Sequence, residues 1–234
     1  MSPKQFSLLP LILSLLAGIA QAQVAPGSQT LIPGQPVERE ISGGQSHTYQ
    51  VKLASGQFVR VVVEQKGIDV ALTLTSPDGK QLIENDVTGI FSARAPLSYE
   101  ATAAGTYQIT IRANRAATQS GAYQVWLELK ASASSPDRKR MAAELLLRES
   151  RGLLMQGRYA DPQLSEKLGH ALALWRELDD RYWQGFTLNV IGLSQYGASQ
   201  FDKAIEPYEQ ALSLWREEKL RAGEASVLRN LGNA

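Results

Sequence analysis

The sequence predicts two modules, an antiparallel β-sandwich of jelly-roll-like type followed by an α-helical solenoid. Three observations predict them. Between residues 37 and 131, short runs rich in β-branched and aromatic residues alternate with Gly-containing turns. From residue 132 onward, apolar residues recur at helical spacing. The helical part also repeats itself every 40 residues without a gap, which is typical of a solenoid.

Residues 1–22 have the pattern of a cleaved export signal. Lys4 precedes an apolar run over residues 6–20, and the small residues Ala20 and Ala22 suit a signal peptidase. The alternative is a transmembrane anchor. The run is shorter than the roughly 20 apolar residues that span a bilayer, and Pro10 and Ser14 interrupt it. We therefore expect an exported chain, periplasmic or extracellular, with no stable membrane anchor after cleavage.

A Pro- and Gly-rich lead-in over residues 23–36 is expected to be extended, and the sandwich follows at 37–131. Alternating apolar residues give several runs one buried face, as in Tyr107, Ile109 and Ile111. Turn signals separate the runs at short intervals, which favours two packed antiparallel sheets. The expected strands are 37–41, 47–53, 58–65, 70–76, 81–84, 90–94, 106–112 and 122–129.

Four motifs between residues 35 and 130 occur in the order seen in a known family. They are Gly67-Ile-Asp-Val-Ala-Leu-Thr-Leu74, Ser76-Pro-Asp-Gly79, Ala104-Gly-Thr-Tyr107 and Gly121-Ala-Tyr123. The segment resembles the bacterial pre-peptidase C-terminal domain. The resemblance implies a small sandwich that assists secretion or targeting of exported bacterial enzymes, without catalysis of its own.

A cluster of oxygen-bearing residues at one end of the sandwich could hold calcium. Its members are Asp69, Asp78, Glu84, Asn85 and Asp86. The alternative is turn chemistry and solvated side chains, because no loop carries the alternating Asp/Asn pattern of a calcium site. His47 stands in a predicted strand without a second ligand. We therefore predict no metal site and no cofactor.

A polar linker at 132–136 leads into the helical region at 137–234. Ser135 is expected to cap the first helix, with Pro136 at its first position. Asp161 and Pro162 repeat this signature at the start of the next helix. Two further helices are expected at about 181–199 and 202–219.

The 40-residue period relates residues whose expected role is packing between helices. They are Gly152, Gly192 and Gly232, then Ala171 with Ala211, Trp175 with Trp215, and, within the second unit, Ala204 and Tyr208. Together with Leu188 and Ile191, the second unit matches the spacing of tetratricopeptide repeats, which the region resembles. The first unit has Leu164 and Leu168 where Ala204 and Tyr208 stand, so it is degenerate. The two tryptophans could stack on a ligand, but packing between adjacent units also accounts for them.

The third unit begins at residues 227–234, where the sequence ends inside a helix. We therefore expect residues 1–234 to be the N-terminal part of a longer protein. The order of export signal, pre-peptidase-like sandwich and 40-residue repeats resembles the N-terminal part of bacterial CHAT-domain proteins. That resemblance implies a caspase-type cysteine peptidase domain beyond residue 234.

Composition narrows the function of residues 1–234. The chain has no cysteine, and its histidines, His47 and His170, are isolated, so we expect no enzyme within it. Residues 23–131 carry nine Lys or Arg and nine Asp or Glu, and residues 132–234 carry fourteen of each. A nucleic-acid partner would call for a basic face, and neither module has a charge excess to supply one.

The remaining prediction is a protein-interaction scaffold, in which the first helices of successive repeats line a concave groove for a peptide or protein partner. The repeat resemblance places Phe186, Asn189, Leu193, Tyr196, Arg229 and Asn233 on that face, with Leu146 and Glu149 from the first unit. One alternative is the targeting or regulatory front of a CHAT-type peptidase. Another is a sandwich that binds carbohydrate or calcium, with the repeats as a spacer.

Overall fold

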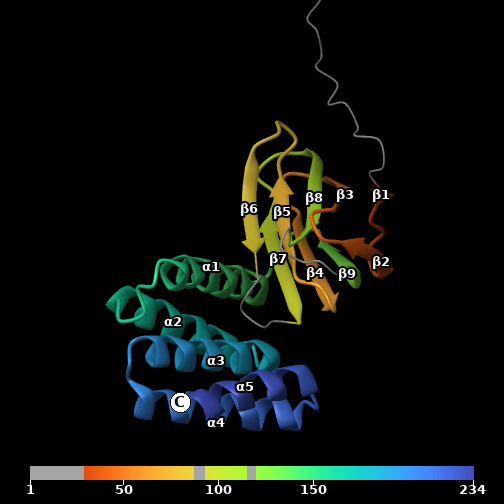
Figure 1. Ribbon diagram of the computed structural model, residues 1–234. Helices are drawn as coiled ribbons and strands as arrows, with labels where there is room; N and C mark the ends of the chain where they lie inside the picture. Colours follow the sequence, from red (N-terminus) through yellow and green to blue (C-terminus); the bar gives the residue numbers. More distant parts are fainter. Residues whose placement is uncertain (1–28, 87–92, 115–119) are drawn as a thin grey trace, which may run out of the picture.

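The computed structural model describes residues 29–86, 93–114 and 120–234, which form a β-sandwich followed by a stack of helices (Figure 1). The first helix lies against the sandwich, and the others continue the stack away from it. The predicted fold class, a β-sandwich followed by a helical region, is confirmed. The predicted export signal at residues 1–22 lies outside the described residues.

Two sheets face each other in the sandwich. Every neighbouring pair of strands is antiparallel except β1 and β3, which run parallel. The first sheet has the order β1 (Gln29–Thr30), β3 (Ser46–Leu53), β8 (Gly105–Ala113), β5 (Val70–Thr75), β6 (Gln81–Asp86). The second sheet has the order β2 (Val37–Ser42), β9 (Ser120–Lys130), β4 (Phe58–Lys66), β7 (Arg94–Glu100).

The core of the sandwich consists of the alternating apolar residues that face inward from both sheets. In β8, Tyr107, Ile109 and Ile111 are at most 1% exposed, as the alternation predicts. The register matches apolar residues across strands, for example Val63 of β4 opposite Val125 of β9. A one-residue slip would turn each of these side chains outward, so burial of one face fixes the register.

All eight predicted strands overlap observed ones, but the strand expected at 90–94 shares only Arg94 with its counterpart. The structure instead has β7 at Arg94–Glu100, and residues 90–92 lie outside the described part of the chain. Two features of β7 explain why the sequence pattern did not predict its bounds. Pro96 stands in its middle, and Ala95, Pro96, Leu97 and Ser98 are all buried, so no alternation marks a single inner face. The short β1 was also not predicted within the lead-in.

Five helices follow the sandwich in the described residues: α1 (Ser135–Met155), α2 (Pro162–Glu177), α3 (Arg181–Gly197), α4 (Phe201–Glu217) and α5 (Arg221–Asn233). Asp161 caps α2 as predicted. The cap of α1 is Ser134 rather than Ser135, because Asp137 three residues later completes a capping box with Ser134. Within the described residues, none of these helices has the length and apolar character of a membrane span.

Small residues lie where the helices approach one another. A Cβ added at Gly192 of α3 would lie 2.5 Å from the ring of Tyr208 in α4, and Tyr208 is itself 1% exposed. Ala204 and Ala211 of α4 are completely buried, and so is Ala171 of α2, which precedes Ala211 by one repeat. These residues belong to the apolar core of the helical region.

The tryptophans lie between helices of neighbouring units. Trp215 of α4 is buried, and its indole lies against Gly185 of α3 and Gly223 of α5. Trp175 of α2, in the first unit, stacks on Trp183 of α3, in the second unit, with ring centroids 5.8 Å apart. Their surroundings are thus side chains and backbone of adjacent helices.

The three glycines related by the period have different surroundings. Gly192 lies against Tyr208, whereas a Cβ added at Gly152 or at Gly232 would meet nothing within 4 Å among the residues that the structure describes. Close approach of two helices therefore requires glycine at Gly192 but not at the other two positions.

We expect Gly192→Ala to destabilise the helical region by about 1–3 kcal/mol, because the new methyl group overpacks against Tyr208. Gly152→Ala is the matched control, since a Cβ at that helical position meets nothing within 4 Å. It should leave stability unchanged or raise it by up to about 1 kcal/mol through helix propensity. Urea unfolding followed by helical circular dichroism measures both. Equal effects of the two substitutions would contradict the packing role of Gly192.

Candidate functional site

The residues predicted to face the groove differ in how far they are exposed. Phe186 and Asn189 of α3 are 5% and 3% exposed, so little of their surface is available to a partner. Leu193 and Tyr196 are half-buried, and Arg229 and Asn233 of α5 are exposed. In the first unit, Leu146 is half-buried and Glu149 forms an ion pair with Lys167.

A side-chain hydrogen bond joins the groove faces of α3 and α5. The Asn230 amide nitrogen donates to Asn189 Oδ1 at 2.9 Å. Leu193 and Tyr196 follow Asn189 by four and seven residues, so they continue the same face of α3. Tyr196 is held from one side by an edge-to-face contact with Phe201, with ring centroids 5.2 Å apart. An accessible strip of the predicted groove therefore runs from Leu193 and Tyr196 toward the exposed residues of α5.

The other end of the predicted groove lies at the junction with the sandwich. A small cavity of about 30 Å³ lies between α1, α3 and the strands β6 and β7. Its lining residues are Asn85, Pro96, Glu144, Leu147, Arg148, Arg151, Leu154, Trp183, Phe186 and Val190. Phe186, which belongs to the helical core, thus lies beside the sandwich at this cavity.

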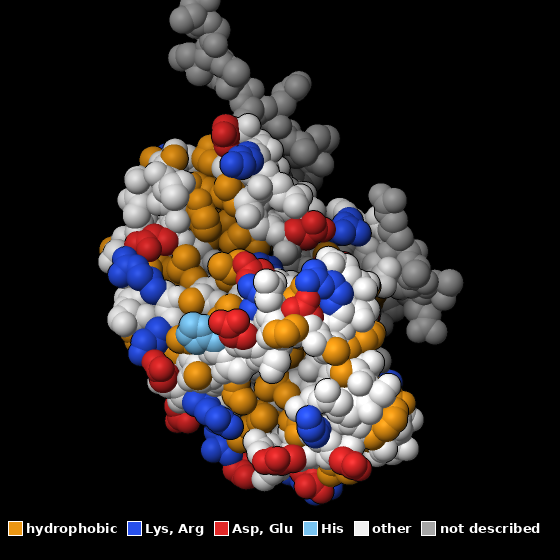
Figure 2. All heavy atoms as spheres, turned by 90° about the vertical axis from the view of Figure 1, so that its left-hand side faces the viewer, with side chains coloured by type: hydrophobic (Ala, Val, Ile, Leu, Met, Phe, Trp, Pro, Cys, Tyr) orange, Lys and Arg blue, Asp and Glu red, His pale blue; other side chains and the backbone are white. Residues whose placement is uncertain are grey.

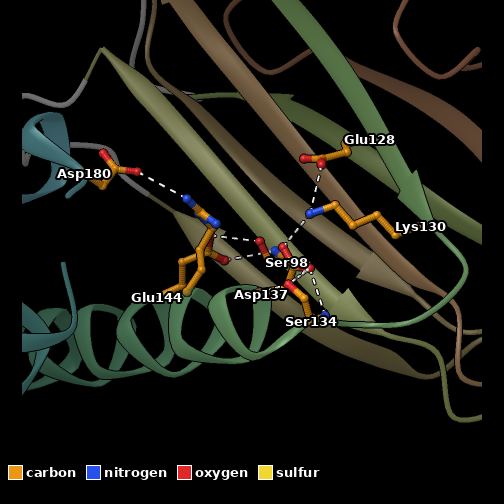
Figure 3. A network of polar contacts seen from close by, with 8 residues as sticks. Ser98, Glu128, Lys130, Ser134, Asp137, Glu144 and Asp180 are labelled. Atoms are coloured by element: carbon orange, nitrogen blue, oxygen red, sulfur yellow. Dashed lines mark hydrogen bonds and ion pairs between the residues drawn. The ribbon is translucent and has the colours of Figure 1, made fainter. Parts of the chain in front are cut away.

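The junction between the modules is built on the free edge of β7. Ser98 donates its backbone N–H to Glu144 Oε2 at 2.9 Å and its hydroxyl to Glu144 Oε1 at 3.0 Å. Pro96 has no N–H, and its carbonyl accepts a hydrogen bond from the Asn85 amide at 2.5 Å. The edge positions of β7 at Pro96 and Ser98 are therefore satisfied by side chains instead of by another strand. Figure 3 shows the contact between Ser98 and Glu144.

Glu144 is 3% exposed and is surrounded by cationic groups from both modules. Burial raises the pKa of Glu144, and Arg60 of β4, the Ser98 hydrogen bonds and Arg148 only partly offset that rise. Burial also lowers the pKa of both arginines. Within the described part of the chain, Arg60 Nε and Arg148 Nη1 are buried without a hydrogen-bond partner. The hydrogen bonds and ion pairs around Glu144, Arg60 and Arg148 therefore do not fully offset the cost of burying these groups.

A second group of polar contacts fixes the start of α1. Lys130 of β9 pairs with Asp137 at 2.7 Å, and Arg138 pairs with Glu100 of β7 at 2.9 Å (Figure 3 shows the first of these). Burial opposes ionisation of Asp137, but hydrogen bonds from Lys130 and Ser134 outweigh it and lower the pKa of Asp137 to about 2. Asp137 thus stays charged and joins the last strand to the capping box of the first helix.

Three further contacts tie the junction to its surroundings. Arg140 of α1 pairs with Asp180, which caps α3, at 3.6 Å. The Arg94 guanidinium of β7 lies 4.6 Å from the ring centroid of Tyr182 in α3. Arg151 of α1 pairs with Asp86 of β6 at 3.4 Å. The sandwich therefore contacts both α1 and α3.

Four of the five residues considered for calcium have other side-chain contacts, and Asp86 pairs with Arg151. Asp78 accepts a hydrogen bond from Ser76 in a turn, Glu84 pairs with Arg112, and Asn85 bonds to Pro96. Among the described residues, no three His, Cys, Asp or Glu side chains are grouped as metal ligands would be. His47 Nδ1 lies 2.8 Å from the Tyr123 hydroxyl, and burial together with Arg39 lowers the pKa of His47.

Sequence reasoning missed the junction. Ser98 and Glu144 are 46 residues apart, and no local pattern joins them. One signal was present in the sequence: Ser134 and Asp137 have the spacing of a capping box, which would have placed the start of α1.

The pKa of Glu144 makes a prediction about pH. A carboxyl with a raised pKa binds its proton more tightly in the folded protein than in the unfolded chain. Its contribution to the free energy of unfolding is complete below the ordinary value of 4.5 and is lost as the pH rises through the raised pKa. Glu144→Gln keeps the shape and cannot ionise, so it should become more stable relative to the natural protein as the pH rises above the ordinary value of 4.5. Urea unfolding across this range measures the difference. A constant difference would show that Glu144 does not titrate differently in the two states.

Comparison with known proteins finds a family similar to the first module. Residues 45–113 match the model of the bacterial pre-peptidase C-terminal domain. No curated protein matches the chain.

Solved structures similar to the sandwich share little sequence with it. They include the pre-peptidase C-terminal domain of a Bacillus anthracis collagenase, at 14% identity and a TM-score of 0.37, covering 43% of this chain and 94% of that one. The Aeromonas hydrophila periplasmic inhibitor of g-type lysozyme has 15% identity and a TM-score of 0.35, covering 44% and 97%. The Yersinia pseudotuberculosis-derived mitogen has 18% identity and a TM-score of 0.34, covering 45% and 94%. The sandwich is therefore similar to the bacterial pre-peptidase C-terminal domain over residues 45–113.

Proposed function

We propose that the chain is an exported protein-interaction scaffold. Its helical units, which resemble tetratricopeptide repeats, bind an extended peptide or a helix of a protein partner, and its sandwich aids secretion or targeting. The observation that carries the proposal is the strip formed by Leu193 and Tyr196 of α3 and by Arg229 and Asn233 of α5. Half-buried apolar and aromatic groups beside exposed polar ones are what a peptide-binding surface requires.

The surface charge is consistent with such a partner. Figure 2 shows Lys and Arg interspersed with Asp and Glu over the face drawn, with hydrophobic side chains among them. Each module is balanced in formal charge. Recognition of the partner would then depend on apolar and hydrogen-bonding contacts more than on a surface potential that is positive or negative throughout.

The pre-peptidase C-terminal domain supports the export part of the proposal. The same domain occurs in the Bacillus anthracis collagenase. The apolar run and Ala20-Gln-Ala22 at the N-terminus supply the sequence signal for export. We infer a periplasmic or extracellular location.

A second candidate is the targeting or regulatory front of a CHAT-type cysteine peptidase. The order of a pre-peptidase C-terminal domain and 40-residue helical repeats favours it. A coding sequence that continues into a domain with catalytic His and Cys would support this candidate, and one without such a domain would remove it.

The groove can be tested with a displayed library of random peptides selected on the full chain. We expect Tyr196→Ala and Arg229→Ala each to weaken the selected peptides roughly tenfold, because side chains of these types carry much of the binding energy at interfaces. Isothermal titration calorimetry measures the affinities. Asn189→Ala is less suitable, because Asn189 is buried and bonded to Asn230.

Lys203→Ala is the matched control for Arg229→Ala, since it removes an exposed cation from α4. It should leave peptide affinity and the thermal unfolding midpoint unchanged. Equal affinity of the natural protein and both groove variants would overturn the proposed binding surface.

A further inference from the structure

One small apolar pocket of the proposed groove lies between the helices and the sandwich. Trp183 and Phe186 of α3 line a cavity with Leu147 of α1 and Pro96 of β7. Trp183 and Phe186 are only 4% and 5% exposed, and the cavity measures about 30 Å³. Such a volume admits about one water molecule and no partner side chain. As long as the sandwich stays in this position, the pocket is too small for a partner side chain.

Many of the contacts that hold the sandwich there are polar. Glu144 accepts from Ser98, Arg138 pairs with Glu100, and Arg94 lies over Tyr182. In contrast, the buried apolar cluster of the sandwich and that of the helices have no residue in common. Separation of the modules would expose the pocket-lining members of the helical core without dividing either core, and interfaces with many polar contacts commonly permit domain motion.

The charges at the junction reduce the free-energy cost of opening. Glu144, Arg60 and Arg148 are all desolvated in the closed arrangement, as their displaced pKa values show. Opening would return these groups to water, which offsets part of the hydrogen bonding that is lost. The closed state has a specific geometry, because Ser98 and Glu144 must lie within hydrogen-bonding distance. The free-energy difference between the closed and open states is small, because opening rehydrates the buried charges.

We propose that the sandwich is an intramolecular lock on the groove, and that a partner with a bulky apolar side chain binds the Trp183–Phe186 pocket only after β7 separates from α1. This inference rests on the groove being the partner-binding surface. The anchor is apolar because Leu147, Leu154, Trp183, Phe186 and Val190 form most of the pocket wall. The rest of the partner lies along Leu193 and Tyr196, on the part of α3 beyond the pocket.

The first experiment measures opening without any partner. The Ser98 amide is bonded to Glu144, so its hydrogen exchange reports the junction directly. We expect it to exchange faster than the amide of Val61 in the middle of β4, and at least roughly tenfold faster in Glu144→Ala than in Glu144→Gln. Equal protection of Ser98 and Val61 in the natural protein would mean that the modules part only on global unfolding, which would overturn the lock.

The second experiment fixes the closed state. The chain has no cysteine, so Glu100→Cys and Arg138→Cys introduce the only two thiols, at side chains that face each other across the junction. A short bis-maleimide joins them, and the same double variant capped with N-ethylmaleimide is the control. Peptides selected for an apolar anchor on Glu144→Ala should bind the cross-linked protein at least roughly tenfold more weakly than the capped control.

The two experiments separate failure of the lock from failure of the groove. Equal peptide affinity with and without the cross-link would overturn the lock and leave the groove as a binding surface. If no variant binds any peptide, the proposed function fails, and the Ser98 exchange data decide the lock independently. Fast Ser98 exchange that the cross-link suppresses would then still show that the modules open and close.

Discussion

The free edge of β7 is the constraint on which the arrangement of the two modules depends. An edge strand presents unpaired backbone groups that can pair with another chain. Pro96 has no N–H and so presents one donor fewer at this edge. The Asn85 amide donates a hydrogen bond to the Pro96 carbonyl, and the Ser98 N–H donates one to Glu144. Because Glu144 belongs to α1, closing this edge also fixes where the first helix lies and hence where the helical stack begins (Figure 1).

The helical stack has a matching requirement at its first unit. Each unit of a solenoid is covered by its neighbours, and α1 has no preceding unit in the described residues. β7 lies against α1 there, so the sandwich supplies contacts that a preceding repeat would otherwise make. The repeat pattern is relaxed in the same unit. Leu168 stands where Tyr208 stands in the second unit, and a Cβ added at Gly152 would meet nothing, whereas one at Gly192 would meet Tyr208.

The sequence was sufficient wherever a local pattern determines structure. Alternation predicted strands such as β8, Asp161 and Pro162 placed the start of α2, and the 40-residue period predicted related helix pairs. It was insufficient where the determining contact is distant in sequence. Glu144 has the appearance of a charge on a solvated helix face, and its burial follows from Ser98 on another module. Phe186 was expected in an open groove, and whether it is exposed depends on where the sandwich docks.

A polar junction has a consequence that an apolar one would lack. Continuous apolar packing between the modules would merge their cores and make separation as costly as partial unfolding. Buried charges such as Glu144 and Arg60 contribute little net stability after desolvation, yet they require a definite geometry to be satisfied. The junction therefore specifies one orientation of sandwich and helices while keeping each core independent. Under the proposed lock, that combination would let the position of the sandwich control how much of the helical surface is available to a partner.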